Sequence, residues 1–301
     1  MIPLVLTTGF LGSGKTTLLR RIAEQESDSK LVFLVNEFSQ HDVDAKLLDA
    51  EGLQAVTIAG GSIFCHCRVT DFIHQLETIP ELFGTPEAPV AAVVVEASGI
   101  ADPMVVQQML AETRLDRIYR LCTVVTVVDP KSFLKLMHTL PNILTQVRAA
   151  DWVILNKVDL CTPAEVRATE AEIERIRPGA RVLETSFCEG DLDLFGALRE
   201  RSLAGKYAKC VDPNYASLSL RFRGPVDMEA LEAALRSTGD AVFRAKGFAA
   251  APGGTVYVDY SAAGFYSEPK DASARGLECI VSGPRLEEVR ALLAHLLEKE
   301  G

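Results

Sequence analysis

The 301-residue chain lacks several features that mark specialised classes of protein. Its longest apolar runs, such as residues 121–128, are far too short to span a bilayer, so no membrane-spanning segment is expected. It also lacks a run of basic residues, and its 41 acidic and 31 basic side chains give a formal net charge of −10. This balance argues against general binding to nucleic acids or to anionic membranes, but it permits an anionic ligand held at a local site.

Paired cysteines are scarce as well. The seven cysteines are an odd number, and only Cys65 and Cys67 lie close together in the sequence. In a chain of this length such scatter is not a disulfide framework and is typical of a reducing, cytoplasmic protein. The apolar residues 1–6 have no positively charged flank and lead directly into a ligand-binding motif, so we interpret them as a buried strand and not as a signal peptide.

The chain has the composition of a globular protein, with 48% apolar and 24% charged residues, and a length sufficient for about two domains. Over the first two thirds, short β-branched runs alternate with longer amphipathic stretches. Strands are expected at residues 4–7, 31–36, 55–58, 91–96, 123–128, 152–156 and 181–185. Several of these runs are apolar almost throughout, which is typical of parallel strands covered on both faces, so the pattern predicts an α/β fold with right-handed crossovers.

The pattern changes at residues 205–216, where turn-forming residues gather. Beyond them, strands are expected at residues 218–222, 241–246, 255–260 and 278–281, and helices at 228–235 and 286–297. This order of elements predicts a small α+β module. We therefore place a first domain at residues 1–205, a linker at 206–216 and a C-terminal α+β domain at 217–301.

The strongest motif lies at residues 9–16, where Gly-Phe-Leu-Gly-Ser-Gly-Lys-Thr matches the G-x-x-x-x-G-K-[ST] pattern between an expected strand and an expected helix. The glycines let successive backbone N–H groups turn toward a phosphate chain, and the start of the following helix adds a partial positive charge. We expect Lys15 to bridge the β- and γ-phosphates and Thr16 to bind Mg²⁺. The nucleotide-binding residues expected here are Gly9, Gly12, Ser13, Gly14, Lys15, Thr16 and Thr17. The first domain is thus predicted to be a P-loop NTPase domain with a mostly parallel sheet.

A second motif predicts which base is bound. Asn156, Lys157 and Asp159 form an N-K-x-D pattern at the end of an expected strand, about 140 residues after the phosphate loop. Asp159 can accept hydrogen bonds from N1–H and N2–H₂ of guanine, whereas adenine would leave the carboxylate opposite an acceptor. Asn156 is expected to face the other edge of the base and to help hold the loops together. Ser186, in the loop after the next strand, is a further candidate for contact with the base.

Two acidic strand ends are candidates for the γ-phosphate and its metal ion. Glu96 ends an expected strand, where an acidic residue reaches Mg²⁺ or its water, and Gly99 lets a backbone N–H approach the γ-phosphate. Glu37 follows the second strand, in a loop placed to become ordered with GTP and to relax after hydrolysis. Each residue also has an interpretation without a ligand: Glu96 would be an acidic strand end beside a turn, and Glu37 would belong to a solvated acidic loop. Lys15, Glu96 and Glu37 are the catalytic candidates, and because no catalytic glutamine or arginine finger is recognisable, hydrolysis is expected to be slow.

The cysteine pair is a candidate metal site. In an extended segment Cys65 and Cys67 project to the same side, and a turn can bring both sulfurs onto one ion. A soft divalent ion such as zinc suits thiolates, and His66 or Glu37 could complete its coordination. The alternative interpretation is two small thiols in a turn.

Together these motifs resemble those of the CobW family of metal-linked GTPases, which is related to UreG and HypB. The similar segments are residues 9–17, 36–38, 96–103, 156–159 and 244–248. The resemblance implies a GTPase of the metallochaperone class that carries zinc or cobalt at the segment containing Cys65 and Cys67. Glu37 and Asp44 match the family's acidic loop positions and join the metal-ligand candidates named above. The full set of candidate ligands for Mg²⁺ and the transition metal is Thr16, Glu37, Asp44, Glu96, Cys65, His66 and Cys67. The C-x-C-C motif that is usual in the family is not intact in this chain.

The resemblance also implies partners. We expect GTP or GDP as ligand and an unidentified metalloprotein as client, and neither nucleic acid nor membrane as a partner. Related GTPases often pair across their nucleotides, so a homodimer is a further expected assembly. An alternative function is a GTP-switched activator or interaction protein for a metalloenzyme or corrinoid enzyme that transfers no metal of its own. A small-molecule kinase built on the same loop is a third hypothesis, against which the guanine motif argues.

Overall fold

The computed structural model describes residues 1–37, 54–59, 63, 69–196, 203, 205, 215–222, 224–261, 264–270 and 276–296. The chain divides into two compact units, Met1–Cys210 and Val211–Gly301, and each is described by itself. Within the described residues, no helix combines the length and the apolar character needed to cross a membrane.

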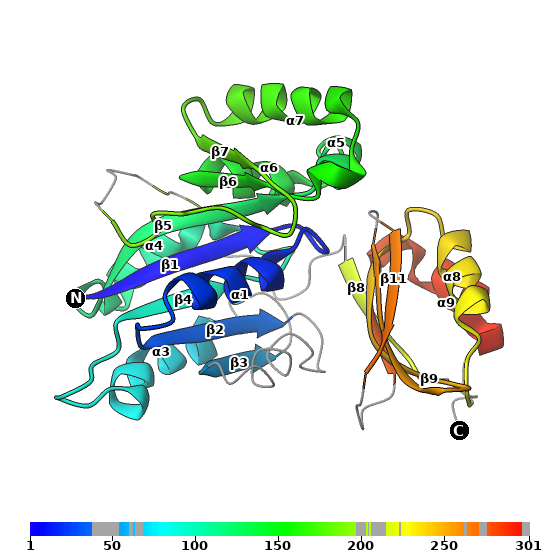
Figure 1. Cartoon of the computed structure of the whole chain (residues 1–301), viewed down its shortest axis with the longest axis horizontal. Coiled ribbons are helices and arrows are strands. Elements are labelled where there is room, and N and C mark those ends of the chain that lie inside the picture. The colour runs from blue at the N-terminus through cyan, green and yellow to red at the C-terminus, as the bar shows by residue number, and fades with distance from the viewer. Residues whose placement is uncertain are drawn as a thin grey trace. The chain divides into compact units, whose positions relative to one another are not determined.

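The first unit is built on a seven-stranded sheet in the order β3-β2-β4-β1-β5-β6-β7, and neighbouring strands run parallel (Figure 1). The strands are β1 (Ile2–Gly9), β2 (Leu31–Glu37), β3 (Ala55–Ala59), β4 (Ala92–Glu96), β5 (Tyr119–Val128), β6 (Trp152–Leu155) and β7 (Arg181–Glu184). The helices are α1 (Lys15–Gln25), α3 (Val69–Phe83), α4 (Val106–Glu112), α5 (Pro130–Leu136), α6 (Pro141–Ala149) and α7 (Pro163–Ile176). Short 3₁₀ turns lie at η1 (Pro103–Val105), η2 (Leu115–Arg117) and η3 (Val158–Leu160).

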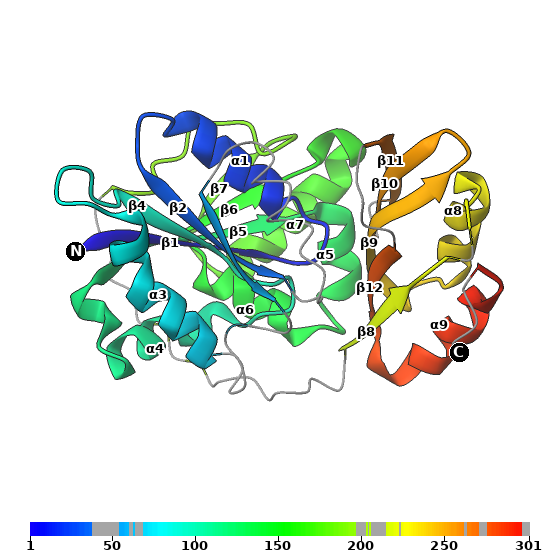
Figure 2. The ribbon, with the colours of Figure 1, turned by 90° about the horizontal axis from the view of Figure 1, so that it is seen from below.

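Helices cover both faces of this sheet, and each face has its own apolar core. Leu4 and Leu6 pack with α3 and α4, whereas Val5, between them on β1, packs with α1. Figure 2 shows α1 on the opposite side of the sheet from α3, α4 and α6. Strands that are apolar on both faces are what a covered parallel sheet requires, so the α/β prediction for this part of the chain is confirmed.

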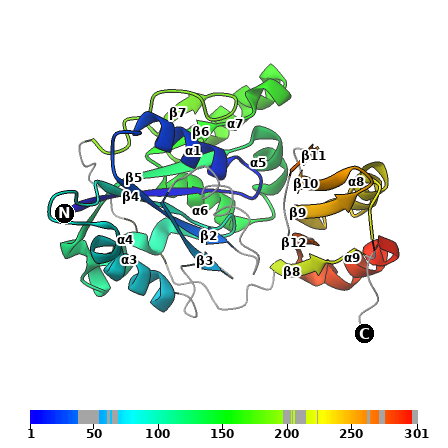
Figure 3. The same cartoon turned by 60° about the horizontal axis from the view of Figure 1, so that its bottom comes forward.

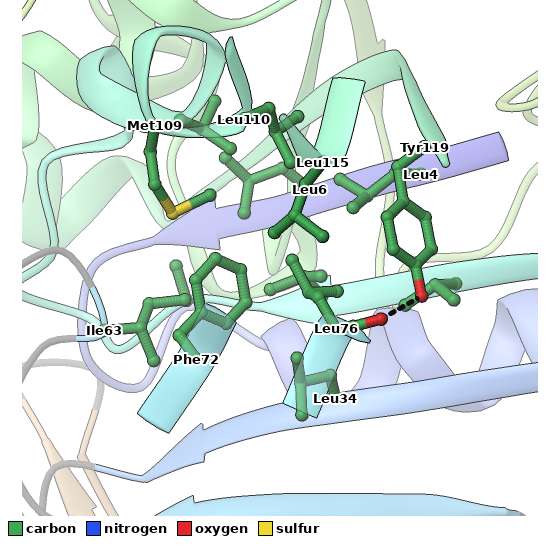
Figure 4. Close-up of a cluster of buried hydrophobic side chains, with 14 of the residues drawn as sticks. Leu4, Leu6, Leu34, Ile63, Phe72, Leu76, Met109, Leu110, Leu115 and Tyr119 are labelled. Carbon is green, nitrogen blue, oxygen red and sulfur yellow. Dashed lines mark hydrogen bonds between the residues drawn. The ribbon is translucent and has the colours of Figure 1, made fainter. Parts of the chain in front are cut away.

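Helix α3 contains a proline, and a tyrosine from the sheet compensates for it. Pro80 has no backbone N–H to donate to the carbonyl of Leu76, four residues earlier in the helix. The hydroxyl of Tyr119, at the start of β5, donates to that carbonyl at 2.7 Å (Figure 4). Tyr119 is 1% exposed, and burial raises the pKa of its hydroxyl, so the group stays protonated as a donor. This hydrogen bond anchors the second half of α3 to the sheet.

Replacing Tyr119 by phenylalanine is expected to destabilise the first unit by about 1–3 kcal/mol, because the carbonyl of Leu76 stays buried without a donor. Urea unfolding followed by the fluorescence of Trp152, the only tryptophan of the chain, reports on this unit. Tyr266→Phe is the control, since the hydroxyl of Tyr266 donates to Glu268 on an exposed strand of the second unit. If both variants unfold at the wild-type urea concentration, Tyr119 does not anchor α3.

The second unit is a five-stranded antiparallel sheet in the order β11-β10-β9-β12-β8, with two helices on one face (Figure 3). Its strands are β8 (Tyr215–Leu220), β9 (Val242–Ala251), β10 (Gly254–Ser261), β11 (Gly264–Pro269) and β12 (Gly276–Ser282). Its helices are α8 (Met228–Ser237) and α9 (Leu286–Leu293), with 3₁₀ turns η4 (Gly283–Arg285) and η5 (Ala294–Leu296). The predicted α+β class of this unit is also confirmed.

Candidate nucleotide-binding site

The loop between β1 and α1 is a tightly held backbone cradle. Gly9 and Gly14 have φ angles of 137° and 114°, which side chains other than glycine rarely adopt. A Cβ atom at Gly9 would lie 2.3 Å from the carbonyl oxygen of Val127, and one at Gly14 would lie 2.3 Å from Nδ2 of Asn156. The loop is therefore packed between the end of β5 and the loop that follows β6.

Lys15 places a buried cation inside this loop. Its side chain is 4% exposed, and Nζ donates to the carbonyl of Phe10 at 3.3 Å. The N–H of Ser13 donates to the same carbonyl at 3.2 Å. Helix α1 begins at Lys15 with Gly14 as its N-cap, so no capping side chain occupies the N–H groups of its first turn. An ammonium group beside a helix N-terminus creates a positive potential suited to a phosphate chain.

The N-K-x-D residues are tied to the backbone of the phosphate loop. Asn156 Nδ2 donates to the carbonyl of Ser13 at 2.9 Å, and Lys157 Nζ donates to the carbonyl of Gly12 at 2.6 Å. The same ammonium group lies 3.6 Å from Oδ2 of Asp129, a buried carboxylate at the start of α5. The structure thus brings two motifs that are more than 140 residues apart in the sequence into one site.

Asp159 and Ser186 meet at the edge of this site. Ser186 Oγ donates to Oδ1 of Asp159 at 2.6 Å, and the backbone N–H of Asp159 lies 3.4 Å from Ser186 Oγ. Asp159 is exposed, so its carboxylate is accessible to a ligand. The hydroxyl therefore orients the carboxylate that the sequence assigns to guanine.

The loop after β7 is held in a strained conformation by neighbouring elements. Phe187 and Cys188 have φ angles of 56° and 55°, which cost non-glycine residues on the order of 1–3 kcal/mol each. Arg21 of α1 donates to the carbonyl of Phe187 at 3.3 Å and to Oε1 of Glu189 at 3.1 Å. The N–H of Cys188 donates to Oδ1 of Asn156 at 3.0 Å. Helix α1 and the N-K-x-D loop together hold the loop that presents Ser186.

Cys188 belongs to this site, although no motif in the sequence separates it from the other scattered cysteines. Its side chain is 1% exposed, and Sγ lies 3.6 Å from the carbonyl of Gly14. Burial raises the pKa of the Cys188 thiol to about 12, so the thiol is neutral at physiological pH and packs as a small apolar group beneath the phosphate loop. Its position in the same loop as Ser186 is the signal that could have identified it.

The loop after β4 contacts the phosphate loop from the other side. Glu96 is buried and pairs in register with Thr7 of β1. A Cβ atom at Gly99 would lie 2.7 Å from the backbone nitrogen of Leu11, so this loop passes directly against the phosphate loop. Gln146 of α6, which the sequence analysis missed, donates from Nε2 to the carbonyls of Gly99 at 3.1 Å and Ala101 at 3.2 Å.

The remaining predicted residues divide into two groups. Thr16 and Thr17 lie in the first turn of α1, and Glu37 is the last residue of β2. The other predicted metal ligands lie outside the described residues: Asp44, Cys65, His66 and Cys67. In the part of the chain that the structure describes, no group of three or more His, Cys, Asp or Glu side chains is arranged to hold a metal ion. The transition-metal site therefore stays a prediction.

Comparison with known proteins gives matches for both units. Residues 3–184 match the family model of the CobW/HypB/UreG nucleotide-binding domain, and residues 215–297 match that of the cobalamin synthesis protein CobW C-terminal domain. The chain is similar to the zinc chaperone YjiA of Escherichia coli (strain K12), with 31% identity over 194 residues that cover 64% of this chain and 59% of that protein. It is also similar to zinc-regulated GTPase metalloprotein activator 1 of Schizosaccharomyces pombe, with 30% identity over 200 residues that cover 64% and 47% of the two chains.

Among solved structures, Zn(II)-bound YjiA GTPase from E. coli aligns over 99% of both chains, with 20% identity and a TM-score of 0.46. The matched segments span about half to three fifths of the length of the curated relatives named above.

Proposed function

This chain belongs to the CobW/HypB/UreG family, and we propose that it binds and slowly hydrolyses GTP and couples its nucleotide state to the binding and delivery of a transition metal. The resemblance inferred from the motifs is thereby confirmed. The observation that carries the proposal is the joining of two motifs: Asn156 and Lys157 donate hydrogen bonds to the phosphate loop at 2.9 and 2.6 Å. Because the two motifs lie side by side, a base recognised by Asp159 and phosphates bound by Lys15 can belong to a single nucleotide.

The residues around the phosphate loop fit a nucleotide triphosphate with Mg²⁺. We propose that Lys15 exchanges its hydrogen bond to Phe10 for phosphate oxygens, and that Gly99 presents its N–H to the γ-phosphate. Thr16 and Glu96 supply oxygen donors of the kind that Mg²⁺ prefers, and the bound ion would neutralise charge that develops on the phosphates. Thr16 ends the phosphate-loop motif in the first turn of α1, and Glu96 lies at the end of β4.

The transition metal is proposed to bind at the segment of Cys65, His66 and Cys67, with Glu37 and Asp44 contributing. Support comes from the family and from relatives that are named zinc chaperones, so zinc is the first ion to test and cobalt the second. All four cysteines in the described residues are free, which supports the proposal of a reducing, cytoplasmic setting where thiolates stay available.

The proposed partners are GTP or GDP, a client metalloprotein and a second copy of the chain. Sedimentation with and without a GTP analogue would detect pairing across the nucleotide, and an unchanged monomer would remove the dimer from the proposal. Nucleic acid and membrane surfaces are not included, because the net charge of −10 opposes general attraction to polyanions.

The function is tested by measuring zinc affinity with and without a non-hydrolysable GTP analogue, for the wild type and for Cys65→Ser/Cys67→Ser. We expect the analogue to tighten zinc binding by about 5–150-fold in the wild type, the usual range for coupled sites, and to have no such effect in the double variant. Cys161→Ser is the matched control, since serine can keep the hydrogen bond that Sγ makes to the carbonyl of Lys157. Equal, weak zinc binding under all conditions would contradict metal delivery and favour a GTP-switched activator that carries no metal.

A further inference from the structure

Asn36, next to last in β2, makes hydrogen bonds to two segments that the proposed function assigns to different ligands. Its Oδ1 atom accepts from the backbone N–H of Ser98 at 3.2 Å and from the N–H of Ile63 at 3.1 Å. Its Nδ2 atom donates to the carbonyl of Ile58, at the end of β3, at 3.3 Å. The side chain is 4% exposed, so these hydrogen bonds form away from solvent.

The first of these segments, which contains Ser98, lies directly against the phosphate loop. Ser98 precedes Gly99, whose α-carbon packs so near to Leu11 that an added Cβ would lie 2.7 Å from its nitrogen. Gln146 holds the far side of the same segment through the carbonyls of Gly99 and Ala101. A γ-phosphate that draws the N–H of Gly99 toward itself would therefore displace Ser98 and, through the hydrogen bond from the Ser98 N–H, the side chain of Asn36.

The second segment leads toward the cysteine pair. Ile63 lies two residues before Cys65, and its side chain is 0% exposed in an apolar cluster with Phe72 of α3 and Met109 of α4. Figure 4 shows Ile63 beside Phe72, at the end of α3 that is nearer to the cysteines in the sequence. The backbone here is fixed by the hydrogen bond to Asn36 and by the packing of its own side chain.

We propose that Asn36 is a positioning residue that couples the nucleotide site to the transition-metal segment through its shared acceptor Oδ1. This inference rests on the proposed function. A buried N–H that loses its acceptor is costly, so the Ser98 and Ile63 segments keep a common arrangement around Asn36. Nucleotide binding at one segment then favours one geometry of the other, and by linkage metal binding favours the nucleotide in return.

Two substitutions separate this role from a general contribution to folding. Both substitutions remove the donor to the carbonyl of Ile58. They differ in the acceptor: Asn36→Leu has a similar size but no acceptor, whereas Asn36→Asp keeps an oxygen that can accept from both N–H groups. The quantity measured is the ratio of the zinc dissociation constants without and with a non-hydrolysable GTP analogue. We expect Asn36→Leu to bring this ratio close to 1 and Asn36→Asp to retain most of the wild-type ratio.

Gln146→Leu is the matched control. It removes hydrogen bonds to the loop after β4, but its partners there do not include Ser98 or Ile63. We expect it to weaken nucleotide binding while the zinc ratio stays within about twofold of the wild type, because the Asn36 hydrogen bonds remain. If Asn36→Leu keeps the wild-type ratio, or if Gln146→Leu loses it equally, the assignment of coupling to Asn36 is overturned.

Hydrogen exchange gives a readout that needs neither metal nor hydrolysis. In the wild type the GTP analogue is expected to slow exchange of the Ile63 amide, and in folded Asn36→Leu the analogue should leave that amide unchanged while still protecting the phosphate loop. The two proposals can fail separately. A wild-type zinc ratio of 1 contradicts the proposed function, whereas a wild-type ratio that persists in Asn36→Leu contradicts only the role of Asn36.

Discussion

Replacing Lys15 by alanine is expected to lower the rate of GTP hydrolysis by about 10²- to 10³-fold, the usual loss when one preorganised donor is removed from a reacting oxyanion. The physical reason is the burial of its ammonium group. Lys15 is 4% exposed, and in the proposed nucleotide complex its hydrogen bond to the carbonyl of Phe10 would give way to a stronger, charge-assisted bond to a phosphate oxygen. Alanine removes the ammonium group and leaves the backbone N–H groups, the start of α1 and the proposed Mg²⁺ to neutralise the phosphates.

The measurement is phosphate release under single-turnover conditions, together with the affinity for a fluorescent GTP analogue. Lys30→Ala is the matched control, because Lys30 Nζ donates to the carbonyl of Ala88, away from the phosphate loop, at 3.4 Å. Both variants should retain the wild-type fluorescence of Trp152. Unchanged hydrolysis in Lys15→Ala would show that residues 9–16 are not the phosphate-binding loop.

The parallel sheet could be predicted from the sequence because its strands carry their own signal. Each of the seven expected runs in the first unit forms a strand. The signal is strongest in β1, β4 and β5, which are largely buried and therefore largely apolar at successive positions, whereas β7 is mostly exposed. Strand β11 was not expected. Its six residues, Gly264–Pro269, include a proline and are mostly exposed or half-buried, and the strand pairs only with β10 within the described residues. An edge strand of that kind has no apolar run to detect.

The helices of residues 130–149 were also missed, although a local signal exists. Asp129 caps α5 by accepting from the N–H groups of Lys131 and Ser132, and a proline begins both α5 and α6. An acidic N-cap followed by proline is a recognisable helix start. These helices are short, at seven and nine residues, so their apolar periodicity is weak and the start signal is the more informative feature.

The residues of the candidate site also fall into two groups: those that a local sequence motif identifies and those that only tertiary contacts identify. The residues proposed to contact phosphate and base occur in motifs of fixed spacing, so Lys15, Asn156 and Asp159 could be chosen from the sequence. The residues that support them cannot be chosen in this way. Arg21 contacts Glu189 across 168 positions, and Gln146 contacts Gly99 across 47. A positioning role of this kind arises only when the chain folds, and no short spacing encodes it.

Replacing Asp159 by asparagine is expected to lower the affinity for GTP by about 10²- to 10⁴-fold and to raise the affinity for xanthosine triphosphate. Guanine presents two donors, N1–H and N2–H₂, and a carboxylate accepts from both. Ser186 Oγ already donates to Oδ1 at 2.6 Å. An asparagine that keeps this hydrogen bond presents an N–H group where the wild type has Oδ2. That donor opposes the amino group of guanine but matches the carbonyl oxygen that xanthine carries at the same position.

Competition between GTP, ATP and xanthosine triphosphate for a fluorescent nucleotide measures the change. Asp116→Asn is the matched control, because Asp116 is an exposed carboxylate on η2, outside the site. The loss of affinity should depend on the base alone, since the substitution does not alter Lys15, the residue proposed to bind the phosphates. A variant that binds all three nucleotides more weakly by the same factor would indicate that Asp159 supports the loop without reading the base. A variant that keeps the wild-type order of affinities would place the base somewhere other than the N-K-x-D loop.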